Sequence, residues 1–203
     1  MISAAIHGFI LAFGLILPLG VQNIFVFNQG AVHKRYSKAL PVALTAAICD
    51  TLLITLAVTG VSILVLGVPW IKNLLFGSGV LFLLYMGWVT WKNASAASSH
   101  MEAESYAPRK QIAFALSVSL LNPHAIIDTI GVIGTSSLSY VGVDKIAFSL
   151  AAIVVSWTWF FGLALAGNLT RKFNSNGNFI VMLNKISAVV IWGVAIYLGL
   201  SFF

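Results

Sequence analysis

Charged residues are scarce in this sequence. They make up 8% of its 203 residues, while hydrophobic residues make up 60%. A soluble domain carries about 25% charged residues, so this composition is typical of an integral membrane protein. Acidic residues are the rarest charged class, with five in the whole chain. Membrane segments take up almost all of the sequence, which excludes a separate soluble catalytic domain.

Cysteine and the common catalytic motifs are also lacking. The one cysteine, Cys49, lies in an apolar stretch, which excludes a disulfide framework and a thiol metal cluster. There is no His-Glu-x-x-His pair, no glycine-rich phosphate loop and no Gly-x-Gly-Asp motif. We therefore expect neither an enzyme nor a bound metal or cofactor, and we interpret Cys49 as a packing residue.

Six apolar stretches are long enough to cross the membrane. A hydrocarbon core of about 30 Å requires about 20 helical residues, and such stretches occupy 3–28, 39–66, 70–91, 111–136, 145–168 and 179–202. The first stretch lacks a basic region before it and is too long for a cleaved signal peptide, so we expect it to stay in the membrane.

The net charge is +6, and the distribution of the basic residues among the loops indicates the orientation of the chain in the membrane. Basic residues are scattered through short loops instead of lining one face, which argues against nucleic acid as a partner. The first, third and fifth loops contain Lys34, Arg35, Lys38, Lys92, Arg109, Lys110, Arg171 and Lys172, and the opposite side has only Lys72 and Lys145. The positive-inside rule predicts cytoplasmic odd-numbered loops and both termini outside.

Two interrupted apolar segments are copies of each other. Pro18 recurs as Pro123 at an offset of 105 residues, as Phe9 recurs as Phe114. Each half has three spans, an odd number, so a duplicated half inserts upside down. The sequence predicts an all-α membrane protein of two inverted three-helix repeats, 1–92 and 111–203, joined by a hydrophilic linker at 93–110. The first and fourth helices are expected to break at Pro18, Gly20 and Pro123, as in transporters built from inverted repeats.

Two of the five acidic residues, Asp50 and Asp128, lie within predicted spans. Each costs roughly 2.5–3.5 kcal/mol at the bilayer centre. A helix–helix hydrogen bond or a pairing with Lys185 would account for them structurally. An ionisable site on a transport pathway is the better interpretation, because intramembrane acids commonly mark such pathways.

Polar residues flank both predicted breaks. Asn23 follows Pro18 by five residues and Asp128 follows Pro123 by five, so the repeat places an amide and a carboxylate at equivalent positions. We expect Gln22, Asn23 and Asn122 to hold the amino and carboxylate groups of a substrate. For His124 two roles stay open: a proton relay, or a neutral donor that orients Asp128 one helical turn away.

Consecutive aromatic residues occur in the fifth predicted span. Trp157 and Trp159, with Phe160 and Phe161 beside them, are candidates for a ring that packs on a cationic substrate. Lipid-facing or core packing is the alternative for the same side chains.

Several strings in the sequence resemble the LysE family of bacterial basic amino acid exporters. They are Ile-Leu-Pro-Leu-Gly-Val-Gln-Asn at 16–23, Phe-Asn-Gln-Gly at 27–30, Ala-Ile-Cys-Asp at 47–50, Leu-Asn-Pro-His at 121–124 with Asp128-Thr129, and Trp-Phe-Phe-Gly-Leu at 159–163. The resemblance runs almost end to end. It is closer to the lysine and arginine branch than to the homoserine and threonine exporters, and Asp128 is one discriminating difference.

The resemblance implies export of lysine, arginine or analogues through the bacterial cytoplasmic membrane. Moving a net charge of +1 outward against the membrane potential costs about 2.3 kcal/mol per 100 mV, so we expect exchange for one proton. The alternatives are an exporter of metal cations or of another small metabolite, and an accessory membrane subunit that transports nothing. The expected partners are a basic amino acid, protons and the lipid bilayer, and the sequence is compatible with a homo-oligomer.

Overall fold

The computed structural model describes residues 1–17, 20–60, 106–122, 125–126 and 129–170, with single helical positions between 77 and 92 and between 182 and 200. Within these residues the chain is helical and has no β-strand. Helices α3 (Leu40–Val58) and α9 (Gly142–Thr170) are long and apolar enough to cross a membrane. A bent helix pair near the N-terminus makes a third span if it is counted as one. The all-helical membrane class predicted from composition is confirmed. The predicted spans 70–91 and 179–202 fall mostly outside the described residues.

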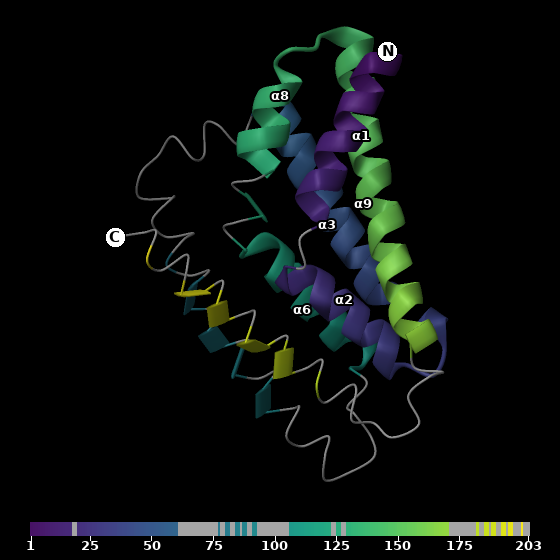
Figure 1. Cartoon of the computed structure of the whole chain (residues 1–203), viewed down its shortest axis with the longest axis vertical. Coiled ribbons are helices and arrows are strands. Elements are labelled where there is room, and N and C mark those ends of the chain that lie inside the picture. The colour runs from purple at the N-terminus through teal and green to yellow at the C-terminus, as the bar shows by residue number, and fades with distance from the viewer. Residues whose placement is uncertain are drawn as a thin grey trace.

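The first predicted span is broken where the sequence indicates. Helix α1 (Ile2–Ile16) and helix α2 (Val21–Val32) meet at a bend of 77°, visible near the middle of Figure 1. Gly20 lies directly before α2 in an extended conformation and is the N-cap residue of that helix. Pro18 lies outside the described residues.

Helix α3 is shorter than expected. It begins at Leu40 with Pro41 in its first turn, where proline fits because the first-turn N–H groups have no helical partner. It ends at Val58, and residues 61–66 of the predicted span 39–66 lie outside the described residues. Gly60 adopts a positive φ of 79° just beyond the helix, the left-handed conformation that terminates many helices.

The second predicted break also appears. Helix α6 (Pro108–Leu120) stops three residues before position 123, and the chain then continues through the π-helical segment η2 (Thr129–Gly134) into the short helix α8 (Thr135–Ser137). Pro123, His124 and Asp128 lie outside the described residues. Because α6 begins at Pro108, the last three residues of the expected linker 93–110 belong to a helix.

The bundle has two chemically distinct ends. At one end, Gln111 bonds to His33 and to the carbonyl of Lys38, so the first residues of α6 lie beside the loop between α2 and α3, which includes the 3-10 turn η1 (Tyr36–Lys38). We call this the basic end, after Lys34, Arg35, Lys38, Arg109 and Lys110. The opposite, N-terminal end is joined by an ion pair between Met1 and Asp144 and by a 2.9 Å hydrogen bond between His7 and Tyr140.

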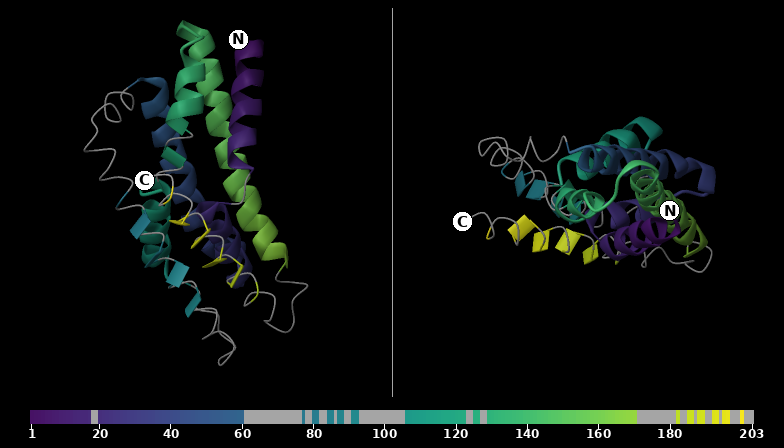
Figure 2. Two further views of the ribbon diagram at one scale, coloured as in Figure 1. Left: turned by 60° about the vertical axis from the view of Figure 1, so that its left-hand side comes forward. Right: turned by 90° about the horizontal axis from the view of Figure 1, so that it is seen from above.

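Helix α9 runs the length of the bundle and packs against both halves of the broken first span (Figures 1 and 2). Glycines allow the backbones to touch. A methyl group on Gly8 would collide with the carbonyl of Phe148, and one on Gly30 with the carbonyl of Ala164. A methyl group on Gly167 would likewise collide with the carbonyl of Phe27. These contacts fix α1 and α2 on one side of α9.

Candidate functional site

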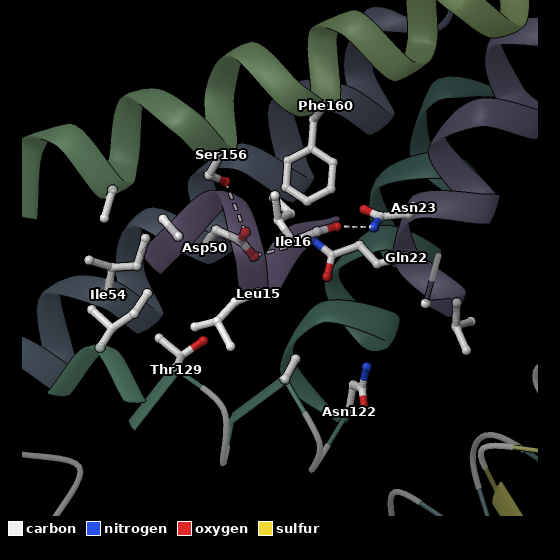
Figure 3. Close-up of a pocket in the computed structure, with 16 residues that line it drawn as sticks. Leu15, Ile16, Gln22, Asn23, Asp50, Ile54, Asn122, Thr129, Ser156 and Phe160 are labelled. Carbon is white, nitrogen blue, oxygen red and sulfur yellow. Dashed lines mark hydrogen bonds between the residues drawn. The ribbon is translucent and has the colours of Figure 1, made fainter. Parts of the chain in front are cut away.

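A cavity of about 290 Å³ lies where the two breaks meet α3 and α9. Figure 3 shows side chains converging on it from these elements. Its polar lining consists of Gln22, Asn23, Asp50, Asn122, Thr129 and Ser156. Leu15, Ile54 and Phe160 are among the apolar residues that complete the wall. Ligand pockets for drug-sized molecules begin near 300 Å³, so this volume suits a ligand of about amino-acid size.

Asp50 is the ionisable group of this cavity among the described residues. It sits near the middle of α3, and its two carboxylate oxygens accept hydrogen bonds from different helices. Ser156 Oγ donates to one oxygen at 2.8 Å, and Gln22 Nε2 donates to the other at 3.3 Å. Ser156 lies at the midpoint of α9, so the carboxylate is held at mid-depth in the bundle.

No basic side chain pairs with Asp50 within the described part of the chain. The ion pair recorded there joins Met1 and Asp144 at the N-terminal end. Lys185, the partner considered from the sequence, has its Nζ 5.8 Å from the centre of the Trp91 ring. The two hydrogen bonds to Asp50 offset part of the cost of a half-buried charge, and no cationic partner lies beside it among the described residues.

The break between α1 and α2 supplies backbone dipoles to the same cavity. Asn23 Nδ2 donates to the carbonyl of Ile16 at 2.7 Å, which ties the start of α2 to the end of α1 (Figure 3). The N-terminus of α2 has no side-chain cap among the described residues. Its first-turn N–H groups therefore present partial positive charge to the cavity. The last carbonyls of α1 present partial negative charge beside them.

The aromatic contacts expected from Trp157 and Trp159 are not found in the cavity lining. Trp157 Nε1 donates to Thr51 Oγ1 at 2.9 Å, and its ring stacks on Phe161. Trp159 packs edge-on against Phe13. Of the four aromatic candidates, Phe160 is the one that lines the cavity, because it follows Ser156 by four residues and so shares its face of α9.

Five of the residues predicted from the sequence come together here: Gly20, Gln22, Asn23, Asp50 and Asn122. Four predicted residues, Pro18, Pro123, His124 and Asp128, are outside the described ranges. Ser156 was not predicted. A lone serine in an apolar helix is a weak signal, because serine commonly satisfies its hydroxyl on its own helix backbone. No group of three or more potential metal ligands occurs among the described residues.

Comparison with known proteins finds relatives that match nearly the whole chain. A family model described as LysE type translocator matches residues 13–201. A Bacillus subtilis (strain 168) protein, YisU, named as a candidate amino-acid transporter, is 55% identical over 99% of this chain and 91% of its own length. The arginine exporter protein ArgO of Salmonella paratyphi A is 37% identical over 98% of this chain and 94% of its own.

A further relative, the arginine exporter protein ArgO of Pectobacterium carotovorum, is 34% identical over 98% of both chains. No solved structure matches the chain significantly. Relatives named as transporters therefore match this chain over nearly its full length.

Proposed function

The chain belongs to the LysE family of translocators, and from this premise we propose that it exports basic amino acids across the bacterial cytoplasmic membrane in exchange for protons. Arginine and lysine are the proposed substrates. The relatives named as arginine exporters support this substrate class.

The carboxylate of Asp50 carries this proposal. It lies in a cavity of amino-acid size with two hydrogen-bond donors and no cation beside it among the described residues. A half-buried carboxylate without a counter-charge is costly, and a guanidinium or ammonium group would supply that charge. A purely structural carboxylate would be replaceable by an apolar residue at a gain in stability, so its presence favours a binding role.

The break next to Asp50 supports recognition of the other end of an amino acid. The substrate carboxylate would bind the uncapped N-terminus of α2, where Gly20 leaves room for close approach. The substrate amino group would bind the carbonyls at the end of α1 and the amide of Asn122 across the cavity. Broken helices bind charged substrate groups in this way in several transporter folds.

Proton exchange follows from the charge of the substrate. Outward movement of a +1 substrate against the membrane potential costs about 2.3 kcal/mol per 100 mV, so uniport would favour entry. Inward movement of one proton per substrate cancels the net charge transfer. Asp50 binds either the proton or the cationic side chain, and that competition couples the two movements.

Two inverted repeats, 1–92 and 111–203 joined at 93–110, form the proposed framework. The second break lies near the position that the 105-residue offset predicts from the first, and α3 shifted by that offset falls within α9. In this framework Pro18 and Pro123 are the points about which the halves rock. Asp128 and His124 then line the pathway from the second repeat, and Asp128→Asn is expected to abolish export while leaving the amount of folded protein unchanged.

The basic end is proposed to face the cytoplasm, with both chain termini outside. Lys34, Arg35 and Lys38 of the first loop and Arg109 and Lys110 of the third loop lie at that one end, as the positive-inside rule predicts for a cytoplasmic face. A cysteine placed after Phe203, in a chain from which Cys49 has been removed, should react with a membrane-impermeant reagent in intact cells. Reaction that requires a permeant reagent would refute this orientation.

Transport in proteoliposomes tests the function itself. Wild-type protein should accumulate radiolabelled arginine in exchange for internal arginine, and unlabelled lysine should compete for uptake. Asp50→Asn should lose this exchange by about 100-fold or more, the usual cost of removing a buried charge partner. Asp144→Asn is the matched control, because Asp144 pairs with the N-terminus far from the cavity. Competition by divalent cations in place of lysine would support the metal exporter instead.

A further inference from the structure

The side chains between α2 and α6 at the basic end are those expected of a closed gate that contains a binding site. We propose that this contact is the cytoplasmic gate of the pathway and that the side-chain oxygens of Gln29 and Gln111 bind the cationic group of the substrate when the gate opens. The inference rests on the proposed function, because it names a second position on the same route.

Two amide oxygens at this contact are buried without a partner. Gln29 is 5% exposed and Gln111 is fully buried, yet Gln29 Oε1 and Gln111 Oε1 accept no hydrogen bond within the described part of the molecule. Gln111 cannot turn its oxygen toward a donor by flipping, because its nitrogen already donates to the carbonyls of Tyr106 at 2.8 Å and Lys38 at 3.0 Å. Buried unsatisfied acceptors are rare and costly, so a donor missing from the closed form is expected to satisfy them.

One face of α2 leads from the cavity to these oxygens. Phe25 and His33 both contact α6, through Phe114 and Gln111 respectively. Gln29 lies four residues from each, so it shares their face of the helix. Gln22, which lines the cavity, is seven residues before Gln29. Seven residues make nearly two helical turns, so the two side chains lie on nearly the same face of α2, about 10 Å apart along the helix axis.

An aromatic stack closes this route between Gln22 and Gln29. The ring centres of Phe25 and Phe114 lie 3.8 Å apart, and the ring centre of Tyr106 lies 6.0 Å from that of Phe114. The Nζ of Lys110 sits 4.3 Å over the Tyr106 ring. The rim of the gate thus already accommodates an alkylammonium group, the chemical group that a lysine substrate carries.

Helix α6 is the element that moves in this proposal. Helix α2 is fixed to α9 by backbone contacts at Gly30 and Gly167, and Asn168 Nδ2 donates to the carbonyl of His33 at 2.8 Å. The α2–α6 contact rests instead on side chains, the Phe25–Phe114 stack and the Gln111 amide. Side-chain contacts separate at lower cost than interlocked backbones, and the end of α6 at Leu120 supplies the hinge.

Cysteine accessibility tests the gate. In a Cys49→Ala background, Gln29→Cys should react with methanethiosulfonate ethylammonium, a cation, faster than with the anionic ethylsulfonate reagent when both are applied at the basic end. Saturating arginine should slow this reaction. Ile24→Cys, about 140° from Gln29 around the helix, is the control and should show neither the charge preference nor protection. No reaction at position 29, or equal rates with both reagents, overturns the gate.

A second variant separates a transit site from a packing role. Gln29→Met removes the unsatisfied oxygen at nearly constant volume, so the protein should melt at the same temperature or roughly 2–4 °C higher. Its KM for arginine at the basic end should rise about tenfold or more. A lower melting temperature with an unchanged KM assigns Gln29 to packing and overturns the site. If wild-type protein moves no arginine, the proposed function fails; if only the Gln29→Met effect is missing, the gate alone fails.

Discussion

Ser156 donates a 2.8 Å hydrogen bond to Asp50 (Figure 3). The bond links the midpoints of α9 and α3, two helices that are each long and apolar enough to cross a membrane. The bond orients the carboxylate toward the cavity that also contains Gln22 and Phe160. Helix α9, which is anchored to α1 and α2 by glycine contacts, thereby sets the position of the charge on α3. The proposed binding of a cation at Asp50 depends on this alignment.

Ser156→Ala should weaken substrate binding without unfolding the protein. A hydrogen bond to a charged group contributes about 1.5–3 kcal/mol, so KM for arginine should rise roughly 10- to 100-fold. Initial-rate uptake over a range of arginine concentrations measures this. Ser149→Ala is the matched control, because Ser149 donates to the carbonyl of Lys145 on its own helix. Equal KM values for the two variants would contradict the positioning role of Ser156.

Gly167→Ala should destabilise the protein, because the added methyl group meets the carbonyl of Phe27. Overpacking of this kind costs about 1–3 kcal/mol, which corresponds to a fall of several degrees, at roughly 2–4 °C per kcal/mol, in the melting temperature of the purified protein. Gly162→Ala on the same helix has open space around it and should melt at or above the wild-type temperature. If the two variants melt alike, the backbone contact between α2 and α9 is not tight.

His33 should make stability depend on pH. Burial, and then the nearby positive charge of Lys38, lower the pKa of His33 from its ordinary range. The folded state therefore binds this proton less readily than the unfolded state. The resulting stabilisation is present above roughly pH 6.5 and declines as pH falls toward the lowered pKa.

Melting temperatures at pH 7.5 and 5.5 measure this effect. The wild-type protein should lose more stability over that interval than His33→Gln, which keeps a polar side chain but does not titrate. The other histidines are the same in both proteins and cancel in the comparison. An equal loss in both proteins would show that His33 does not contribute.

The breaks in the helices could be predicted because their causes are local. Proline and glycine act on their own turn of helix, and α1 ends at Ile16 while Gly20 is the N-cap residue of the next helix. The polar residues beside the first break, Gln22 and Asn23, then follow directly into the cavity. The early end of α3 could not be predicted from hydropathy, since apolar residues continue beyond Gly60. The structure shows the end of the helix at Val58, followed by Gly60 with a positive φ.

The residues that face the cavity from α9 depend on packing. Four aromatic residues occupy positions 157 and 159–161, and the sequence does not say which one lies toward Asp50. The rotation of α9 is set by distant contacts, such as Gly8 against Phe148 and Gly30 against Ala164. That rotation brings Ser156 and Phe160 to the cavity and turns Trp157 and Trp159 to other neighbours.

Proton flux coupled to arginine movement tests the central claim most directly. Proteoliposomes with clamped membrane potential are given external arginine, and external pH is recorded alongside arginine uptake. We predict external acidification with one proton leaving for each arginine that enters, and neither signal with Asp50→Asn. Arginine uptake by the wild-type protein without proton movement, or unchanged coupling in Asp50→Asn, would contradict an exchange of cation for proton at Asp50.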